Sequence, residues 1–174
     1  MANQGVAAVK VEVLARQLNV SKGSFYWHFR NRRELLEGIL QRWENETLRL
    51  IEESQKEPTP EQQLIKMFAL AEELCNLPDP ETAIFIWANQ NPEIQKRVRI
   101  VETKRVEHLN QLLQNYGFDE TEARHKAEIG YFAFMGFWER KERDKKFDLS
   151  MKEFGEFLID LLLSPVKTRE DTIN

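Results

Sequence analysis

The sequence predicts an all-α protein, and three observations lead to this fold class. Its 174 residues include only seven glycines and six prolines, which is few for a turn-rich β fold. Apolar residues recur at the three- and four-residue spacing of helices buried on one face, and no stretch clearly shows the alternation of a strand. Two proline-containing breaks, at residues 56–63 and 76–82, separate the helical runs. We therefore expect roughly seven or eight helices.

The N-terminal segment, residues 11–29, divides into two short helical pieces joined by a tight turn, which is the arrangement of a helix-turn-helix. Asn19 suits the turn because asparagine tolerates positive φ, and Ser21 suits the N-cap of the second piece. Asn31 is placed to cap the next helix, with Glu34 three residues further on as in a capping box.

The next three helices are expected from their apolar stripes. The helix that Asn31 caps carries apolar residues at helical spacing as far as residue 51. A second stripe covers residues 64–75, and residues 84–88 form a short apolar segment. Both proline-containing breaks fall between these runs, so we expect each run to be a separate helix.

The last three helices are expected from their end signals. Pro92 begins a long amphipathic run that Gly117 stops. Asp119, with a glutamate three residues later, has the spacing of a capping box and begins a helix to about Arg143. Ser150 and Glu153 repeat this signature before a final helix that reaches Leu163 and ends at Pro165.

Charge is distributed unevenly along the chain. Residues 1–45 hold seven basic and four acidic side chains, a net charge of +3, whereas the remainder holds 18 basic and 25 acidic ones, a net charge of −7. A basic end on an acidic body predicts a polyanion as a partner of the N-terminal part.

Composition also excludes several classes of protein. Cys75 is the single cysteine, so no intrachain disulfide framework exists. The longest apolar run, residues 129–138, is too short to span a bilayer, so we expect a cytoplasmic protein without a membrane partner. We find no pair of nucleophile and base, no phosphate loop and no convincing ligand spacing around His108 or His125. We therefore expect neither an enzyme nor a cofactor or metal site.

The stretch VSKGSFYWHFRNRREL, residues 20–35, resembles the recognition-helix signature of the TetR family of bacterial transcriptional regulators. The resemblance covers about residues 9–40, and beyond them the chain matches only in its expected all-α architecture. It implies a DNA-binding domain over residues 1–45 and an effector-binding and dimerisation domain over residues 46–174.

The resemblance implies roles for matching residues. Lysine, serine and tyrosine side chains would reach base edges and phosphates, the tryptophan and histidine would touch the DNA backbone, and Arg32 would grip a phosphate at the start of the linking helix. Phe25 and Phe29 would hold the recognition helix on its core. The alternative for any one of these side chains is ordinary packing or a solvated face. The predicted DNA-binding residues are Lys10, Ser21, Lys22, Gly23, Ser24, Tyr26, Trp27, His28 and Arg32.

The chain departs from the family pattern at its start. Family members carry a further helix before the position of Gly5, and here MANQG matches only the end of that helix. We expect either that the true start lies upstream of Met1 or that the DNA-binding core is incomplete. Lys10 and Asn19 also replace a common threonine and a common glycine. An alternative function is therefore a dimeric helical ligand-binding or interaction protein that has lost DNA binding with its first helix.

The resemblance also implies that the acidic body binds an unidentified small molecule and forms a homodimer, which would suit a palindromic double-stranded operator. The family default is a repressor that the effector releases from DNA. Candidate effector-pocket residues, which could equally fill a core, are Met67, Phe68, Phe85, Trp87, His108, Phe132 and Met135. Candidate dimer-interface residues are Gly130, Phe134, Phe137, Trp138, Phe154, Phe157, Leu158 and Leu161.

Overall fold

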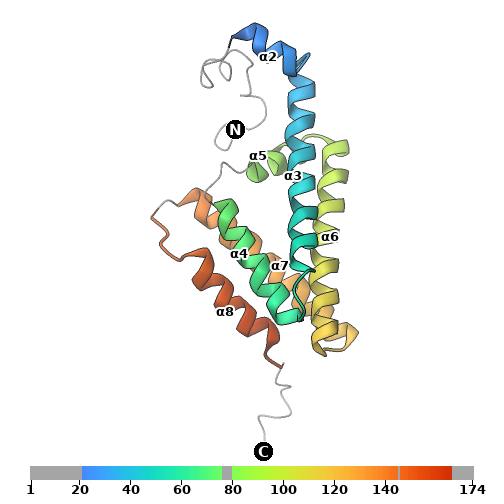
Figure 1. Cartoon of the computed structure of the whole chain (residues 1–174), viewed down its shortest axis with the longest axis vertical. Helices are drawn as coiled ribbons and strands as arrows, with labels where there is room; N and C mark the ends of the chain where they lie inside the picture. Colours follow the sequence, from blue (N-terminus) through green and yellow to red (C-terminus); the bar gives the residue numbers. More distant parts are fainter. Residues whose placement is uncertain (1–20, 76–79, 145, 166–174) are drawn as a thin grey trace, which may run out of the picture. The chain divides into compact units, whose positions relative to one another are not determined.

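The computed structural model describes residues 21–75, 80–144 and 146–165, and every regular element in these ranges is an α-helix (Figure 1). The predicted all-α fold class is therefore confirmed. The fold is built from α2 (Lys22–His28), α3 (Arg32–Ser54), α4 (Pro60–Cys75), α5 (Glu81–Ala88), α6 (Pro92–Tyr116), α7 (Glu120–Arg143) and α8 (Met151–Leu163). Within the described ranges no helix has the length and apolar character needed to cross a membrane.

Local signals determine most helix ends, as predicted. Ser21 Oγ accepts the Ser24 amide of α2 at 3.0 Å, and Asp119 caps α7 by accepting the amides of Thr121 and Glu122. Ser150 and Glu153 form the complete capping box of α8, and these hydrogen bonds lower the pKa of Glu153. The helix α6 ends before Gly117, which has a φ of 127° that side-chain-bearing residues rarely adopt.

Several N-terminal predictions concern residues outside the described ranges. The first helical piece of the helix-turn-helix, the turn at Asn19 and the candidate DNA contact Lys10 belong to residues 1–20. The prediction about a missing first helix also falls there. The second piece is α2, which lies where the sequence pattern places the recognition helix.

The chain divides into two compact units. Unit 1 comprises residues 1–49 and 76–104, and unit 2 comprises residues 50–75 and 105–174. Both α3 and α6 contribute their first part to unit 1 and their last part to unit 2. The functional division at residues 45 and 46, predicted from the sequence, remains a proposal.

Unit 1 encloses a small apolar core between α3, α5 and α6. Trp43 of α3 is 5% exposed, and its indole donates a hydrogen bond to the buried carboxylate of Glu81 at 3.3 Å. The buried apolar members of this core are Leu40, Trp43, Ile84, Ala88, Ile94, Val98 and Val101.

Unit 2 is held by close packing between α4 and α8, which lie side by side in Figure 1. Gly155 makes this approach possible, because a Cβ atom there would lie only 2.8 Å from Cγ of Phe68. At the C-terminal end of α8, Lys126 of α7 is buried and donates to the carbonyls of Leu162 and Ser164 at 2.9 and 2.6 Å. Its ammonium therefore satisfies carbonyls at the C-terminal end of α8.

Candidate nucleic-acid interface and effector region

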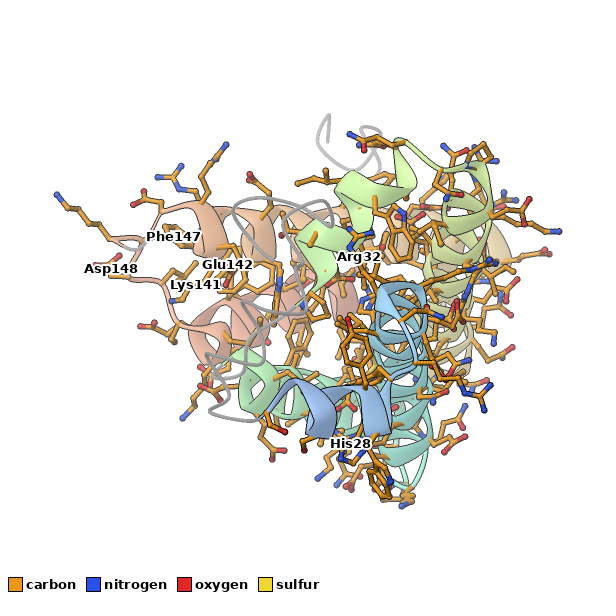
Figure 2. The ribbon with its side chains drawn as sticks, turned by 90° about the horizontal axis from the view of Figure 1, so that it is seen from above. His28, Arg32, Lys141, Glu142, Phe147 and Asp148 are labelled. Atoms are coloured by element: carbon orange, nitrogen blue, oxygen red, sulfur yellow. The ribbon has the colours of Figure 1, made fainter. Side chains whose placement is uncertain are left out.

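The short helix α2 presents polar and aromatic side chains to solvent. Trp27 is 81% exposed and Tyr26 is 48% exposed, and His28 is exposed at the end of the helix (Figure 2). The rings of Trp27 and His28 meet edge to face with centroids 4.7 Å apart. Such exposed rings contribute little to a core, so packing does not explain them.

The start of α3 follows α2 after a short turn. Asn31 Oδ1 accepts the Glu34 amide at 3.0 Å, and the Glu34 carboxylate accepts the Arg30 amide at 2.6 Å. Because the Glu34 carboxylate is used in this way, the first turn of α3 is firmly capped. Arg32 lies in this first turn and is exposed (Figure 2).

One aromatic ring connects the turn to the core. Phe29 is half-buried and packs against Leu35 and Leu36 of α3, with its ring edge 3.5 Å from the position of a Cβ on Gly38. This contact fixes the chain between α2 and α3, as predicted for Phe29. The side chains of Lys22 and Phe25 lie outside the description, so their predicted roles remain predictions.

The described members of the predicted DNA-binding set lie on one short stretch, residues 21–32, whereas Lys10 lies outside the described residues. Hydroxyl, phenol, imidazole, indole and guanidinium groups donate hydrogen bonds to phosphate oxygens, and such contacts set the register of a protein on DNA. A Cβ on Gly23 would meet nothing closer than 3.7 Å, so this glycine serves no packing need inside the chain. The exposed members of the set are Ser21, Gly23, Ser24, Tyr26, Trp27, His28 and Arg32.

Sequence reasoning missed the ionic contact that joins α3 to α6 in unit 1. Arg97 donates from Nε and Nη2 to both carboxylate oxygens of Glu44 at 2.7 and 2.6 Å, and from Nη1 to Glu37 at 2.6 Å. These bonds, first to Glu44 and then to Glu37, raise the pKa of Arg97 despite its partial burial. The sequence carried no signal for this pairing, because Arg97 and Glu44 are 53 positions apart.

The candidate effector residues are distributed over both units. Phe85 and Trp87 are half-buried in unit 1, whereas Met67, Phe68 and Met135 are half-buried in unit 2. Phe132 is 65% exposed, so unit 2 does not enclose it. A single pocket that uses all seven residues remains a prediction.

His108 is buried in unit 2 and pairs with Ser54, whose hydroxyl lies 3.0 Å from Nε2. The Ser54 hydroxyl donates to the Ile51 carbonyl at 2.8 Å, so its oxygen accepts a hydrogen bond from the Nε2–H tautomer of His108. Burial lowers the pKa of His108 and favours the neutral ring.

The candidate dimer residues separate into buried and exposed groups. Phe137, Trp138 and Leu158 are buried inside unit 2, and a Cβ on Gly130 would lie 3.1 Å from Leu109 and Leu162. These four residues pack within the chain, and Phe134 and Phe154 are half-buried. By contrast, Phe157 is 71% exposed and Leu161 is 53% exposed on α8, one helical turn apart.

Comparison with known proteins identifies the N-terminal segment and the fold. Residues 1–39 match the family model described as "Bacterial regulatory proteins, tetR family", which confirms the resemblance read from the motif. No curated protein matches the chain. A solved structure, the transcriptional regulator FadR from Bacillus subtilis in complex with stearoyl-CoA, has a similar fold, with a TM-score of 0.62 over 95% of this chain and 93% of that one. The two sequences are 16% identical, so this likeness concerns the fold alone.

Proposed function

We propose that this member of the TetR family of bacterial regulatory proteins is a transcriptional repressor that a small-molecule effector releases from DNA. The observation that carries the proposal is the exposed surface of α2 and the first turn of α3, within and beside the matched segment. Trp27, His28 and Arg32 are exposed there.

In this proposal α2 enters the major groove. Base edges and phosphates are reached by Lys22, Ser24 and Tyr26. The DNA backbone is contacted by Trp27 and His28. Arg32 holds a phosphate from the start of α3. Its charge opposes the helix dipole, and a phosphate would offset this cost.

The repressor would act as a homodimer on a palindromic operator. The exposed Phe157 and Leu161 on α8, together with Ile129 and Phe132 on α7, which are 59% and 65% exposed, supply apolar surface for a second copy. Two-fold symmetry would then place two copies of α2 in successive major grooves. Replacing Phe157 with Glu would shift sedimentation toward the monomer, whereas the neighbouring Glu156→Gln would not.

Effector release would be a population shift. The effector would bind more tightly to the conformation that cannot span both half-sites, so it would increase the population of that conformation and lower the affinity for DNA. The ratio of the effector's affinities for the two conformations sets the limit of this decrease. The FadR structure contains stearoyl-CoA, a ligand with a long apolar chain. Met67, Phe68 and Met135 of unit 2 are half-buried apolar side chains, which is the type of residue that an apolar ligand would contact.

Fluorescence anisotropy with DNA flanking the protein's own gene tests the DNA-binding part. The full chain should bind, and Arg32→Gln should weaken binding. In a plot of the logarithm of the association constant against the logarithm of salt concentration, this variant should have a slope that is smaller in magnitude by about one. Arg33→Gln is the matched control, since Arg33 is also exposed in the same turn but is not assigned to DNA. If the two variants behave alike, Arg32 has no special role. If no genomic fragment binds at any salt concentration, the interaction-protein alternative takes the place of the repressor.

A further inference from the structure

Six aromatic rings form a continuous cluster in unit 2. Trp138 and Phe134 of α7 have ring centroids 5.9 Å apart, and Phe134 continues to Phe68 of α4 at 6.2 Å. Phe68 in turn lies 6.1 Å from Phe154 of α8, whose ring stacks on Phe137 at 4.3 Å. Phe147, 5.9 Å from Phe137, completes the cluster.

One polar atom inside this cluster has no use within the described parts of the chain. Trp138 is 8% exposed, and its Nε1 is the one buried side-chain nitrogen or oxygen in the described ranges that lacks a hydrogen-bond partner. Buried donors are nearly always paired, because leaving one unpaired destabilises the fold. An acceptor supplied by another molecule would remove this cost.

The surrounding rings are not sealed off. Phe68, Phe134, Phe147 and Phe154 are all half-buried, although they pack directly around buried Trp138 and Phe137. Half-buried aromatic rings beside a donor suit a small molecule that inserts an apolar body between rings. A partner protein's surface suits the arrangement less well, because it would have to carry an acceptor in to a nitrogen that is already buried.

We propose that this cluster is the effector site and that the Trp138 indole N–H is its polar anchor. The effector class is an apolar compound with one neutral acceptor, such as a ketone or ester carbonyl. This inference rests on the proposed function and names the ligand chemistry that the regulator would recognise. It also moves Trp138 from the predicted dimer interface to the effector site.

The neutral character of the acceptor follows from the nearby charges. Arg140 and Lys141 approach the Phe147 ring at 5.3 and 6.0 Å, and Figure 2 shows Lys141 beside Phe147. Arg140 is paired with Asp144 at 3.1 Å, and Lys141 donates to the Leu149 carbonyl at 2.8 Å while its charge is attracted by the Glu153 carboxylate. A ligand carboxylate at Trp138 would therefore receive one hydrogen bond from a neutral donor, while the nearby cations are already engaged with other groups. These interactions would not offset the free-energy cost of removing the carboxylate from water.

The test uses two probes of nearly equal shape, acetophenone and ethylbenzene, which differ by a carbonyl oxygen. The full chain labelled with ¹⁵N has four tryptophans and hence four indole N–H signals to follow by NMR. Acetophenone should move the Trp138 signal downfield, as a new hydrogen bond does, and should bind more tightly than ethylbenzene. Trp138→Phe keeps a ring but removes the donor, so it should abolish this preference, a loss of about two- to tenfold in affinity for the ketone.

Trp43→Phe is the matched control, because the indole N–H of Trp43 in unit 1 is also buried but already donates to Glu81, and Trp43 is outside the cluster. It should leave the preference for the ketone unchanged. If Trp138→Phe does not fold, the other three tryptophans can each be replaced by Phe. Each replacement removes one indole signal, so the signal that remains in all three variants belongs to Trp138 and can be followed in the wild-type chain.

The proposal is overturned if neither probe moves the Trp138 signal up to its solubility limit, or if both probes move it equally. These outcomes concern ligand binding alone. Loss of the repressor function itself would instead appear as absent DNA binding by the unliganded chain, so the two failures are distinguishable.

Discussion

Arg97 joins α3 to α6 in unit 1 through three short ionic hydrogen bonds, whereas Gly155 joins α8 to α4 in unit 2 by letting the backbone approach Phe68. The first contact is directional, half-exposed and charged. The second is apolar and depends on shape. This difference teaches that the stability of unit 1, which carries α2, should change gradually with salt and substitution, while the stability of unit 2 should fall sharply when volume is added.

The largest effect is expected from volume added at Gly155. Gly155→Ala places a Cβ 2.8 Å from Cγ of Phe68, so α4 and α8 must separate and the free energy of unfolding should fall by about 1–3 kcal/mol. Gly136→Ala is the matched control, because nothing lies within 4 Å of its Cβ. There the better helix propensity of alanine should raise stability by about 0.5–1 kcal/mol. Denaturant unfolding measures both, and equal signs for the two variants would contradict the packing account.

A smaller effect is expected from breaking the ionic contact. Arg97→Gln leaves Glu37 and Glu44 without their shared cation, and partial exposure limits the loss to about 1 kcal/mol. The loss should shrink in 1 M salt, because screening weakens the pair in the wild type. The raised pKa of Arg97 means that the guanidinium stays charged, so this contribution should not change between neutral and mildly alkaline pH. A difference in unfolding free energy that is independent of salt would indicate that packing, and not charge, links α3 to α6.

The smallest effect is expected from pH acting on His108. Burial lowers the pKa of His108 in the folded state, so the unfolded chain binds a proton more readily as pH falls below about 6.5. Stability from this residue is therefore present above the unfolded pKa and lost as pH falls toward the folded one. His108→Gln should reduce the pH dependence of the thermal midpoint between pH 7.5 and 5.5. An unchanged pH dependence would assign the effect to other groups.

Sequence patterns predicted helix ends better than they predicted contacts between helices. The caps at Ser21, Asp119 and Ser150 were predictable because each bond joins residues two or three positions apart. Arg97 and Glu44 are 53 positions apart, and Gly155 and Phe68 lie on different helices. Periodicity marks which face of a helix is buried but not which helix covers it.

The candidate sites follow the same rule. The candidate DNA-binding residues could be proposed from the sequence because they lie on one short segment with a recognisable order of residue types, and their contact with DNA remains a prediction. The aromatic residues of α7 and α8 were assigned to a dimer interface, yet Phe137 and Trp138 pack inside unit 2. Composition alone does not separate a ring that faces a partner from one that faces its own core.

The most direct test of the account is the dependence of DNA affinity on salt for the full chain and a DNA fragment from beside its own gene. We predict that the logarithm of the association constant falls linearly with the logarithm of salt concentration, because exposed groups of α2 and α3 displace counterions from phosphates. A flat dependence, or no binding at low salt, would contradict the claim that this surface reads DNA.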